Sequence, residues 1–150
     1  MNEQPYPKQY LYRRLVQSKL FIDNNYTQNI DVECISDQAF FSKFHFIRLF
    51  KSIYGRTPHQ YLSHVRIENA KQLLKEDISV TEVCFAVGFD SVTSFIGLFK
   101  SVVGKTPLVY KLQQHNLRAE VSIMPLKFIP GCFAGRDDSP QKSNSQEADY

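Results

Sequence analysis

An internal repeat constrains the fold of this chain more than any other feature of its 150 residues. Residues 49–52 (LFKS) return 49 positions later as residues 98–101. Upstream the offset is 48, because Ile30 corresponds to Ile78. A repeat of this kind indicates two copies of one supersecondary unit. The extra residue of the second copy is expected in its turn, around 88–90.

Each copy is predicted to form a helix, a short turn and a second helix, which is the helix-turn-helix arrangement. Residues with oxygen-bearing side chains precede each expected helix, and a glycine follows the second one, as is typical of helix ends. No convincing strand pattern occurs before residue 115, so we expect an all-α fold. The N-caps are Asp31 and Ser42 in the first copy and Ser79 and Ser91 in the second, and the terminal glycines are Gly55 and Gly104.

Apolar residues at helical spacing identify the side chains that should be buried. The turn of the second copy contains Gly88, which suits a positive φ angle. The corresponding turn of the first copy is expected at residues 40–41. The predicted core consists of Val32, Ile35, Ala39, Phe46, Phe50 and Ile53 in the first copy and of Val80, Val83, Val87, Phe95, Phe99 and Val102 in the second.

A long helix is expected between the copies, over residues 58–75. Thr57 and Pro58 supply a capping hydroxyl and a first-turn proline, and Gln60 completes a capping box. Eighteen residues at about 1.5 Å each span roughly 27 Å, near the roughly 34 Å between successive major grooves on one side of B-DNA. Its buried stripe is predicted to be Tyr61, Leu62, Val65, Ala70, Leu73 and Leu74.

The predicted domain covers residues 10–115, with helix-turn-helix units at about 30–56 and 79–105. Residues 1–9 are expected to form a polar arm. Residues 116–150 form a tail in which prolines exclude a continuing helix over 121–133, leaving an extended or loosely attached segment, and residues 135–150 are expected to be disordered. An amphipathic helix is expected from residue 10 to about 26, with the apolar residues Leu11, Leu15, Val16, Leu20 and Ile22.

Composition narrows the classes of function. Hydrophobic residues are 43% and charged residues 22% of the chain, as in soluble globular proteins. No apolar run reaches the about 18 residues of a membrane span, and the first residues lack a signal pattern, so we expect a cytoplasmic protein with no membrane association. Residues 1–115 hold 14 Lys and Arg against 10 Asp and Glu, which permits a polyanionic partner without requiring one.

Features that could indicate catalysis or metal binding have simpler explanations. Residues 104–106 (GKT) are similar to the end of a phosphate-binding loop, but Phe99 stands where that loop needs a glycine. His59 and His64 are five residues apart, which is poor spacing for two metal ligands on one helix face. The three cysteines lie far apart and lack a nearby base. We therefore expect no enzyme activity, no metal site and no cofactor.

Over about residues 10–114 the chain resembles the DNA-binding domain of the AraC/XylS family of bacterial transcription regulators. The first copy contributes Ser42, His45, Phe46, Arg48, Phe50 and Lys51, and the segment between the copies contributes Tyr61, Leu62, Arg66, Ile67, Ala70, Leu73 and Leu74. The second copy contributes Val87, Gly88, Phe89, Ser91, Phe95, Phe99, Lys100, Gly104, Thr106, Pro107 and Tyr110.

The resemblance implies seven helices in two helix-turn-helix subdomains joined by a linker helix. It implies promoter DNA as the partner and, commonly, activation of transcription through contact with RNA polymerase. Only about nine residues precede the first helix, which leaves no room for the small-molecule sensor domain that many members carry. We therefore expect a stand-alone member or an isolated domain.

The second helix of the first copy is the better candidate for reading DNA. Residues 44, 47, 48 and 51 share one stripe at i, i+3, i+4 and i+7, opposite Phe46 and Phe50. The planar fork of the arginine suits guanine O6 and N7, the apolar residues suit thymine methyls, and the lysines suit phosphates. The alternative places the two apolar residues in the core and the arginine on a solvated face. The candidates are Lys43, Phe44, Ile47, Arg48 and Lys51.

The second copy offers a weaker reading face, because Gly97 stands where the family usually has an arginine. Its candidates are Thr93, Ile96 and Lys100, so the first copy is expected to specify sequence while the second docks mainly on the backbone. Helix N-termini and nearby cations can also bind phosphate. The candidate phosphate contacts are Arg56, Thr57, Ser79, Lys105, Thr106 and Lys111.

The function expected from these features is that of a sequence-specific DNA-binding transcription regulator that reads the major groove mainly through the first helix-turn-helix. One alternative is a protein-interaction domain whose second helix-turn-helix docks a partner such as RNA polymerase. Another is an accessory domain of a DNA-modifying enzyme.

Overall fold

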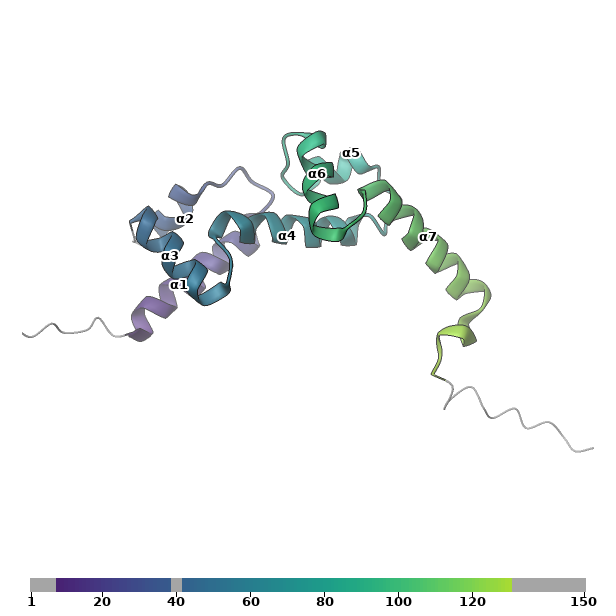
Figure 1. Cartoon of the computed structure of the whole chain (residues 1–150), viewed down its shortest axis with the longest axis horizontal. Helices are drawn as coiled ribbons and strands as arrows, with labels where there is room; N and C mark the ends of the chain where they lie inside the picture. The colour runs from purple at the N-terminus through teal and green to yellow at the C-terminus, as the bar shows by residue number, and fades with distance from the viewer. Residues whose placement is uncertain (1–7, 39–41, 131–150) are drawn as a thin grey trace, which may run out of the picture. The chain divides into compact units, whose positions relative to one another are not determined.

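The computed structural model of the chain describes residues 8–38 and 42–130 (Figure 1). In this part of the chain the regular structure is entirely helical, which confirms the expected all-α class. The chain divides into two compact units, residues 1–114 and 115–150. The helices are α1 (Lys8–Asn25), α2 (Val32–Gln38), α3 (Lys43–Tyr54), α4 (Pro58–Leu73), α5 (Val80–Ala86), α6 (Val92–Val103), α7 (Pro107–Ile123) and the 3₁₀ turn η1 (Pro125–Phe128).

The helix boundaries reproduce the sequence repeat. Helices α2 and α5 each have seven residues and begin 48 positions apart, whereas α3 and α6 each have twelve and begin 49 positions apart. The extra residue therefore lies between α5 and α6, as expected. Gly88 in that turn has φ of +89°. The counterpart turn at 40–41, together with Ala39, lies outside the described residues.

Each copy has its own hydrophobic core built on a pair of phenylalanines. Phe46 and Phe50 are fully buried with ring centroids 5.5 Å apart, and Phe95 and Phe99 are fully buried at 5.7 Å. A tyrosine from the following helix packs edge-on against the second ring of each pair, Tyr61 in one copy and its repeat counterpart in the other, at 5.7 and 5.6 Å. The repeat thus preserves side-chain packing as well as helix order.

The predicted third member of each phenylalanine stripe was wrong. Ile53 is 40% exposed and Val102 is 47% exposed. Their neighbours Tyr54 and Val103 pack against the cores instead. Helical period alone favours the seventh position, which lies about 20° from the first phenylalanine, over the eighth, which lies about 80° away. In the first copy the ring contacts of Tyr54 with Phe50 and with Tyr61 of the next helix account for its packing.

Helix α1 also buries a narrower stripe than its sequence indicated. Leu15 and Ile22 are buried, together with Ser18, whose hydroxyl donates to the carbonyl of Leu15 at 2.8 Å. Val16 and Leu20 are 48% and 50% exposed. They lie on the side of the helix away from the α2 and α4 contacts that cover the buried stripe.

Helix α4 packs against helices of both copies, since it contacts α1, α2 and α3 as well as α5 and α6. It has 16 residues, about 24 Å at 1.5 Å per residue, and ends at Leu73 rather than at 75. Ile67 is fully buried although the predicted stripe omitted it, whereas Tyr61, Val65 and Leu73 are only partly buried. The other predicted members, Leu62, Ala70 and Leu74, are buried.

The prediction of an extended segment in the tail was wrong where the structure describes it. Helix α7 runs on to Ile123, and η1 follows at Pro125–Phe128. Pro125 explains the break, because its ring and missing N–H end an α-helix. Residues 135–150 lie outside the described residues. Among the described helices, none is long and apolar enough to cross a membrane.

Candidate nucleic-acid interface

Helix α3 presents its predicted reading stripe to solvent. It begins after Ser42 and ends at Gly55, which has φ of +71° and donates its N–H to the carbonyl of Lys51 at 2.9 Å. Because Phe46 and Phe50 anchor one side of the helix in the core, the other side faces outward.

The side chains on this outward face are accessible to a partner. Phe44 is 78% exposed, Arg48 and Lys51 are exposed, and Ile47 is partly buried. The alternative in which Phe44 belongs to the core is therefore wrong. The ring is therefore accessible to a partner on the outer side of α3.

Two cations on α3 are free to meet an anion. Arg48 and Lys51 make no side-chain hydrogen bond or ion pair with any residue that the structure describes. Lys43 differs, because its Nζ lies 2.8 Å from Oε1 of Glu33, and this hydrogen bond raises the pKa of Lys43 above its ordinary value. A phosphate at Lys43 would have to displace that carboxylate.

Helix α6 offers much less charge at the equivalent positions. Thr93, Gly97 and Lys100 are exposed, and Lys100 is the one cation of this helix. Ile96 is only partly available, since it packs against the second core together with Val92. The positions of α6 that correspond to the α3 stripe therefore combine one hydroxyl, one ammonium and apolar surface.

The two capping boxes occupy donors that had been expected to bind phosphate. The N–H of Thr57 donates to Oε1 of Gln60 at 3.0 Å, and the N–H of Ser79 donates to Oε2 of Glu82 at 3.0 Å. The hydrogen bonds from Ser79 lower the pKa of Glu82 below its ordinary value. A carboxylate therefore lies at the start of α5, where a phosphate would be repelled, and this arrangement argues against Ser79 as a phosphate contact.

The remaining phosphate candidates differ in how free they are. Arg56 is exposed, and Thr106 accepts only a long 3.4 Å hydrogen bond from the N–H of Val109. Lys105 donates to Gln113 at 2.7 Å. Lys111 is largely enclosed, with a side chain only 17% exposed.

Lys111 is also held in place by its own contacts. Its Nζ donates to the carbonyl of Ile78 at 2.7 Å and lies 3.5 Å from Oδ1 of Asp77. These contacts join the start of α7 to the turn before α5. The geometry therefore gives Lys111 a structural role and argues against a phosphate contact.

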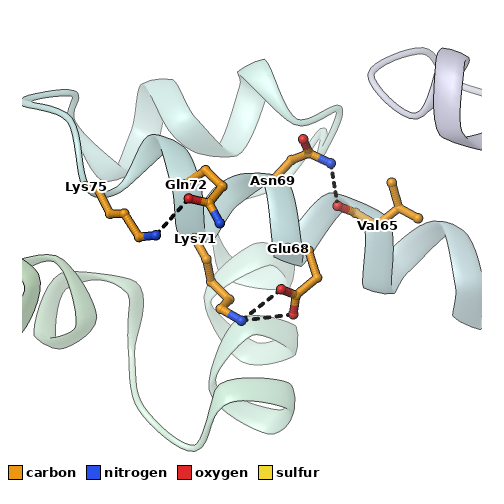
Figure 2. A network of polar contacts seen from close by, with 6 residues as sticks. All are labelled: Val65, Glu68, Asn69, Lys71, Gln72 and Lys75. Atoms are coloured by element: carbon orange, nitrogen blue, oxygen red, sulfur yellow. Dashed lines mark hydrogen bonds and ion pairs between the residues drawn. The ribbon is translucent and has the colours of Figure 1, made fainter.

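Two basic residues, one near the end of α4 and one just after it, have polar partners on α4. Figure 2 shows Lys71 bound to both carboxylate oxygens of Glu68, at 3.0 and 2.8 Å, and Lys75 bound to Oε1 of Gln72 at 2.7 Å. Asn69 on the same segment donates to the carbonyl of Val65 at 2.9 Å. These cations do not extend the interface on α3.

Sequence reasoning missed one engaged cation, Arg66, which it noted only as part of a family motif. Its guanidinium donates to the carbonyls of Tyr26 and Gln28 at 2.7 and 2.8 Å. No local signal could have identified these partners, because they lie 40 and 38 residues away along the chain. Within the described residues, no group of three or more His, Cys, Asp or Glu could hold a metal ion.

Comparison with known proteins gives consistent results. Residues 35–113 match the family model of a helix-turn-helix domain. The MmsAB operon regulatory protein of Pseudomonas aeruginosa is 45% identical over 62 residues, which cover 41% of this chain and 20% of that protein. The uncharacterized helix-turn-helix-type regulator YbfI of Bacillus subtilis is 32% identical over 69 residues, covering 46% of this chain and 25% of that protein.

A solved structure of the DNA-binding domain of AdpA, a global transcriptional factor in complex with a target DNA, has a TM-score of 0.64 and 29% identity to this chain. The match covers 74% of this chain and 96% of that domain. By contrast, the chain spans only between 19% and 53% of the lengths of the curated relatives. The similarity therefore concerns the helix-turn-helix part of those proteins.

Proposed function

Because the chain belongs to the helix-turn-helix family of AraC/XylS-type domains, we propose that it is a transcription regulator that binds double-stranded promoter DNA in the major groove, mainly through α3. The observation that carries this proposal is the outward stripe of α3. There Arg48 and Lys51 are exposed and have no partner within residues 8–38 and 42–130, and the Phe44 ring is 78% exposed.

These side chains make two kinds of contact with DNA, to bases and to phosphates. Arg48 can donate two hydrogen bonds to O6 and N7 of one guanine, and Phe44 with Ile47 can contact thymine methyls. Lys51 binds a phosphate, which adds affinity without sequence preference. Lys43 binds a second phosphate when that phosphate displaces the carboxylate of Glu33.

The second copy contributes mainly to docking on the backbone. On α6, Thr93 can hydrogen-bond a base edge and Lys100 can bind a phosphate, while Ile96 offers a small apolar contact. Outside the two reading helices, further phosphate contacts come from Arg56 of the first copy and from Lys105 and the N-terminus of α7 at Thr106. Thr93 can donate only one hydrogen bond to a base whereas Arg48 can donate two, so sequence preference should be weaker beneath α6.

The regulator acts in the cytoplasm, and RNA polymerase is the partner through which it would activate transcription. The proposal includes no cofactor, no catalytic residue and no small-molecule ligand. Among the AraC/XylS relatives, the AdpA domain is described in complex with a target DNA, which supports DNA as the partner here.

One observation favours the second candidate function, in which α6 docks a protein. A mainly apolar groove lies beside α6 and the start of α7, and Val80, Val92, Ile96 and Leu108 line it together with Lys111. DNA offers few apolar groups to such a groove, whereas a protein partner offers many.

Selection from random duplex DNA at two salt concentrations separates the two candidate functions. A regulator enriches a defined site, and its affinity falls steeply with salt because bound phosphates release counterions. Arg48→Ala should abolish enrichment at the guanine, and Arg13→Ala, an equal loss of charge on the exposed side of α1, should not. If the wild type enriches no site and shows no salt dependence, the DNA-binding function is wrong and the docking function stands.

A further inference from the structure

The loop that leads from α1 into the first helix-turn-helix copy contacts the second copy directly, beside the α4 helix that joins the copies. The contact is between this α1–α2 loop and the α5–α6 turn of the second copy. A Cβ built on Gly88 would lie 2.7 Å from the carbonyl oxygen of Thr27 and 2.8 Å from that of Tyr26. Only glycine permits this approach, and the ring of Tyr26 packs against both hydrophobic cores.

Arg66 of α4 contacts both the α1–α2 loop and the α5–α6 turn. Its Nε donates to the carbonyl of Tyr26 at 2.7 Å, and its Nη2 donates to the carbonyl of Gln28 at 2.8 Å. The same guanidinium lies 5.5 Å from the ring centroid of Phe89, in the turn of the second copy. The planar, charged guanidinium of Arg66 therefore holds the α1–α2 loop and the α5–α6 turn together.

These contacts matter because a single helix is a weak restraint on two bodies. Small changes at the ends of α4 would change the angle between the copies, and a direct contact beside the helix prevents them. Arg66 donates hydrogen bonds to two loop carbonyls, which would lose these partners if the loop moved away. The loop is therefore held by hydrogen bonds of defined direction.

We propose that Arg66 is a positioning residue for DNA recognition, fixing α3 and α6 at one relative register. It thereby keeps α6 in place to contact the DNA backbone while α3 reads its bases. This inference rests on the proposed function. Arg66 itself contacts no DNA in this scheme and acts through the loop carbonyls and Phe89.

The test is a thermodynamic cycle between Arg66 and Lys100, the lysine that binds the backbone from α6. Lys100→Ala is introduced into the wild type and into the Arg66 variants, and each protein is titrated with the duplex that the wild type selects. The quantity measured is the ratio of Kd with Lys100→Ala to Kd without it, in each background.

We expect this ratio to be about 5 or more in the wild-type background, about 2 or less in the Arg66→Ala background, and intermediate in the Arg66→Lys background, which keeps the charge and can reach one carbonyl. Arg56→Ala serves as the control background, because the loss of an independent phosphate contact raises both Kd values equally and leaves the ratio unchanged.

The outcomes distinguish this inference from the proposed function. An unchanged ratio in Arg66→Ala, with binding still specific, overturns the positioning role and leaves the DNA-binding function intact. A wild type that binds no site specifically overturns both. Thermal unfolding accompanies the titrations, and failure of both Arg66 variants to fold would assign this residue to stability alone and overturn the proposal.

Discussion

The hydroxyl of Tyr61 on α4 donates a 2.8 Å hydrogen bond to Oδ1 of Asp23 on α1, across 38 residues of sequence. Lys19 completes the network, with Nζ 2.7 Å from Oδ2 of the same carboxylate. The hydrogen bond with Asp23 raises the pKa of Lys19 above its ordinary value. These contacts fasten the first helix of the chain to the helix that supports both copies.

Tyr61→Phe should reduce the free energy of unfolding by about 1–2 kcal/mol, since a hydrogen bond to a charged acceptor is lost while the ring packing against Phe50 remains. Urea unfolding measures the change. Tyr110→Phe is the matched control at the repeat position, where the hydroxyl has no hydrogen-bond partner among the described residues. Equal losses in both variants would mean that the Asp23 bond contributes nothing.

Arg48→Ala should cost about 1–3 kcal/mol of binding free energy and remove the preference at a single base pair of the selected site. The reason is that the guanidinium is exposed and unpaired within the described structure, so its donors are available to a base edge. Titration of the selected duplex and its single-base variants measures the preference. Intact affinity and preference in this variant would rule out Arg48 as the base-reading residue.

Lys51→Ala should weaken binding to all duplex sequences alike and reduce the slope of log K against log salt by about one. Lys71→Ala provides the control, because Lys71 is paired with Glu68 on α4 (Figure 2) and lies outside the proposed interface. Titrations at several salt concentrations give both slopes. A sequence-dependent loss in Lys51→Ala would mean that this lysine reads a base.

Local sequence rules predicted the parts of this fold that depend on neighbours within a few residues. Gly55 and Gly104 end α3 and α6 at φ of +71° and +82°, as only glycine does readily, and the capping box of Thr57 and Gln60 formed as its spacing indicated. The buried phenylalanines followed from helical periodicity. Exposure of the α3 stripe followed from the same pattern, once the opposite side was assigned to the core.

Contacts between distant segments could not be predicted in this way. Lys111 was assigned to a phosphate because it is a lysine near a helix start, yet its partner is the carbonyl of Ile78, 33 residues earlier. Arg66 binds carbonyls whose position depends on the packing of a loop. The partners of long side chains are the groups that the fold brings close to them, and a single sequence does not show which distant residues lie close together in space.

Gly97→Ala should raise the free energy of unfolding by about 1 kcal/mol, because alanine is the better helix former and an added Cβ meets no atom within 4 Å. Thermal unfolding should show an increase in Tm of about 2–4 °C. Gly104→Ala is the control with the opposite sign, since its φ of +82° strains any residue with a Cβ. Loss of DNA affinity in the stabilised Gly97 variant would indicate that α6 approaches DNA closely at this position, whereas unchanged affinity would exclude such an approach.

The capping box of α5 should make part of the free energy of unfolding depend on pH in the acidic range. The hydroxyl and the N–H of Ser79 both favour the carboxylate form of Glu82, which lowers the pKa of Glu82 below the ordinary value of 4.5. The native state therefore favours the ionised form. Its contribution to stability is fully present above about pH 4.5 and is lost as the pH falls through the lower pKa of the folded state.

Wild type should thus lose more stability between pH 6 and pH 3 than Glu82→Gln, which keeps an acceptor that does not titrate. Gln60→Glu is the reciprocal variant, because it places a carboxylate in the equivalent position of the α4 box and should increase the acid dependence. Other carboxylates with lowered pKa, such as Asp31, titrate in all three proteins and cancel in the comparison. Thermal unfolding at each pH measures the loss of stability. Identical losses in the three proteins would show that protonation of the acceptor side chain in either capping box does not change the stability of the fold.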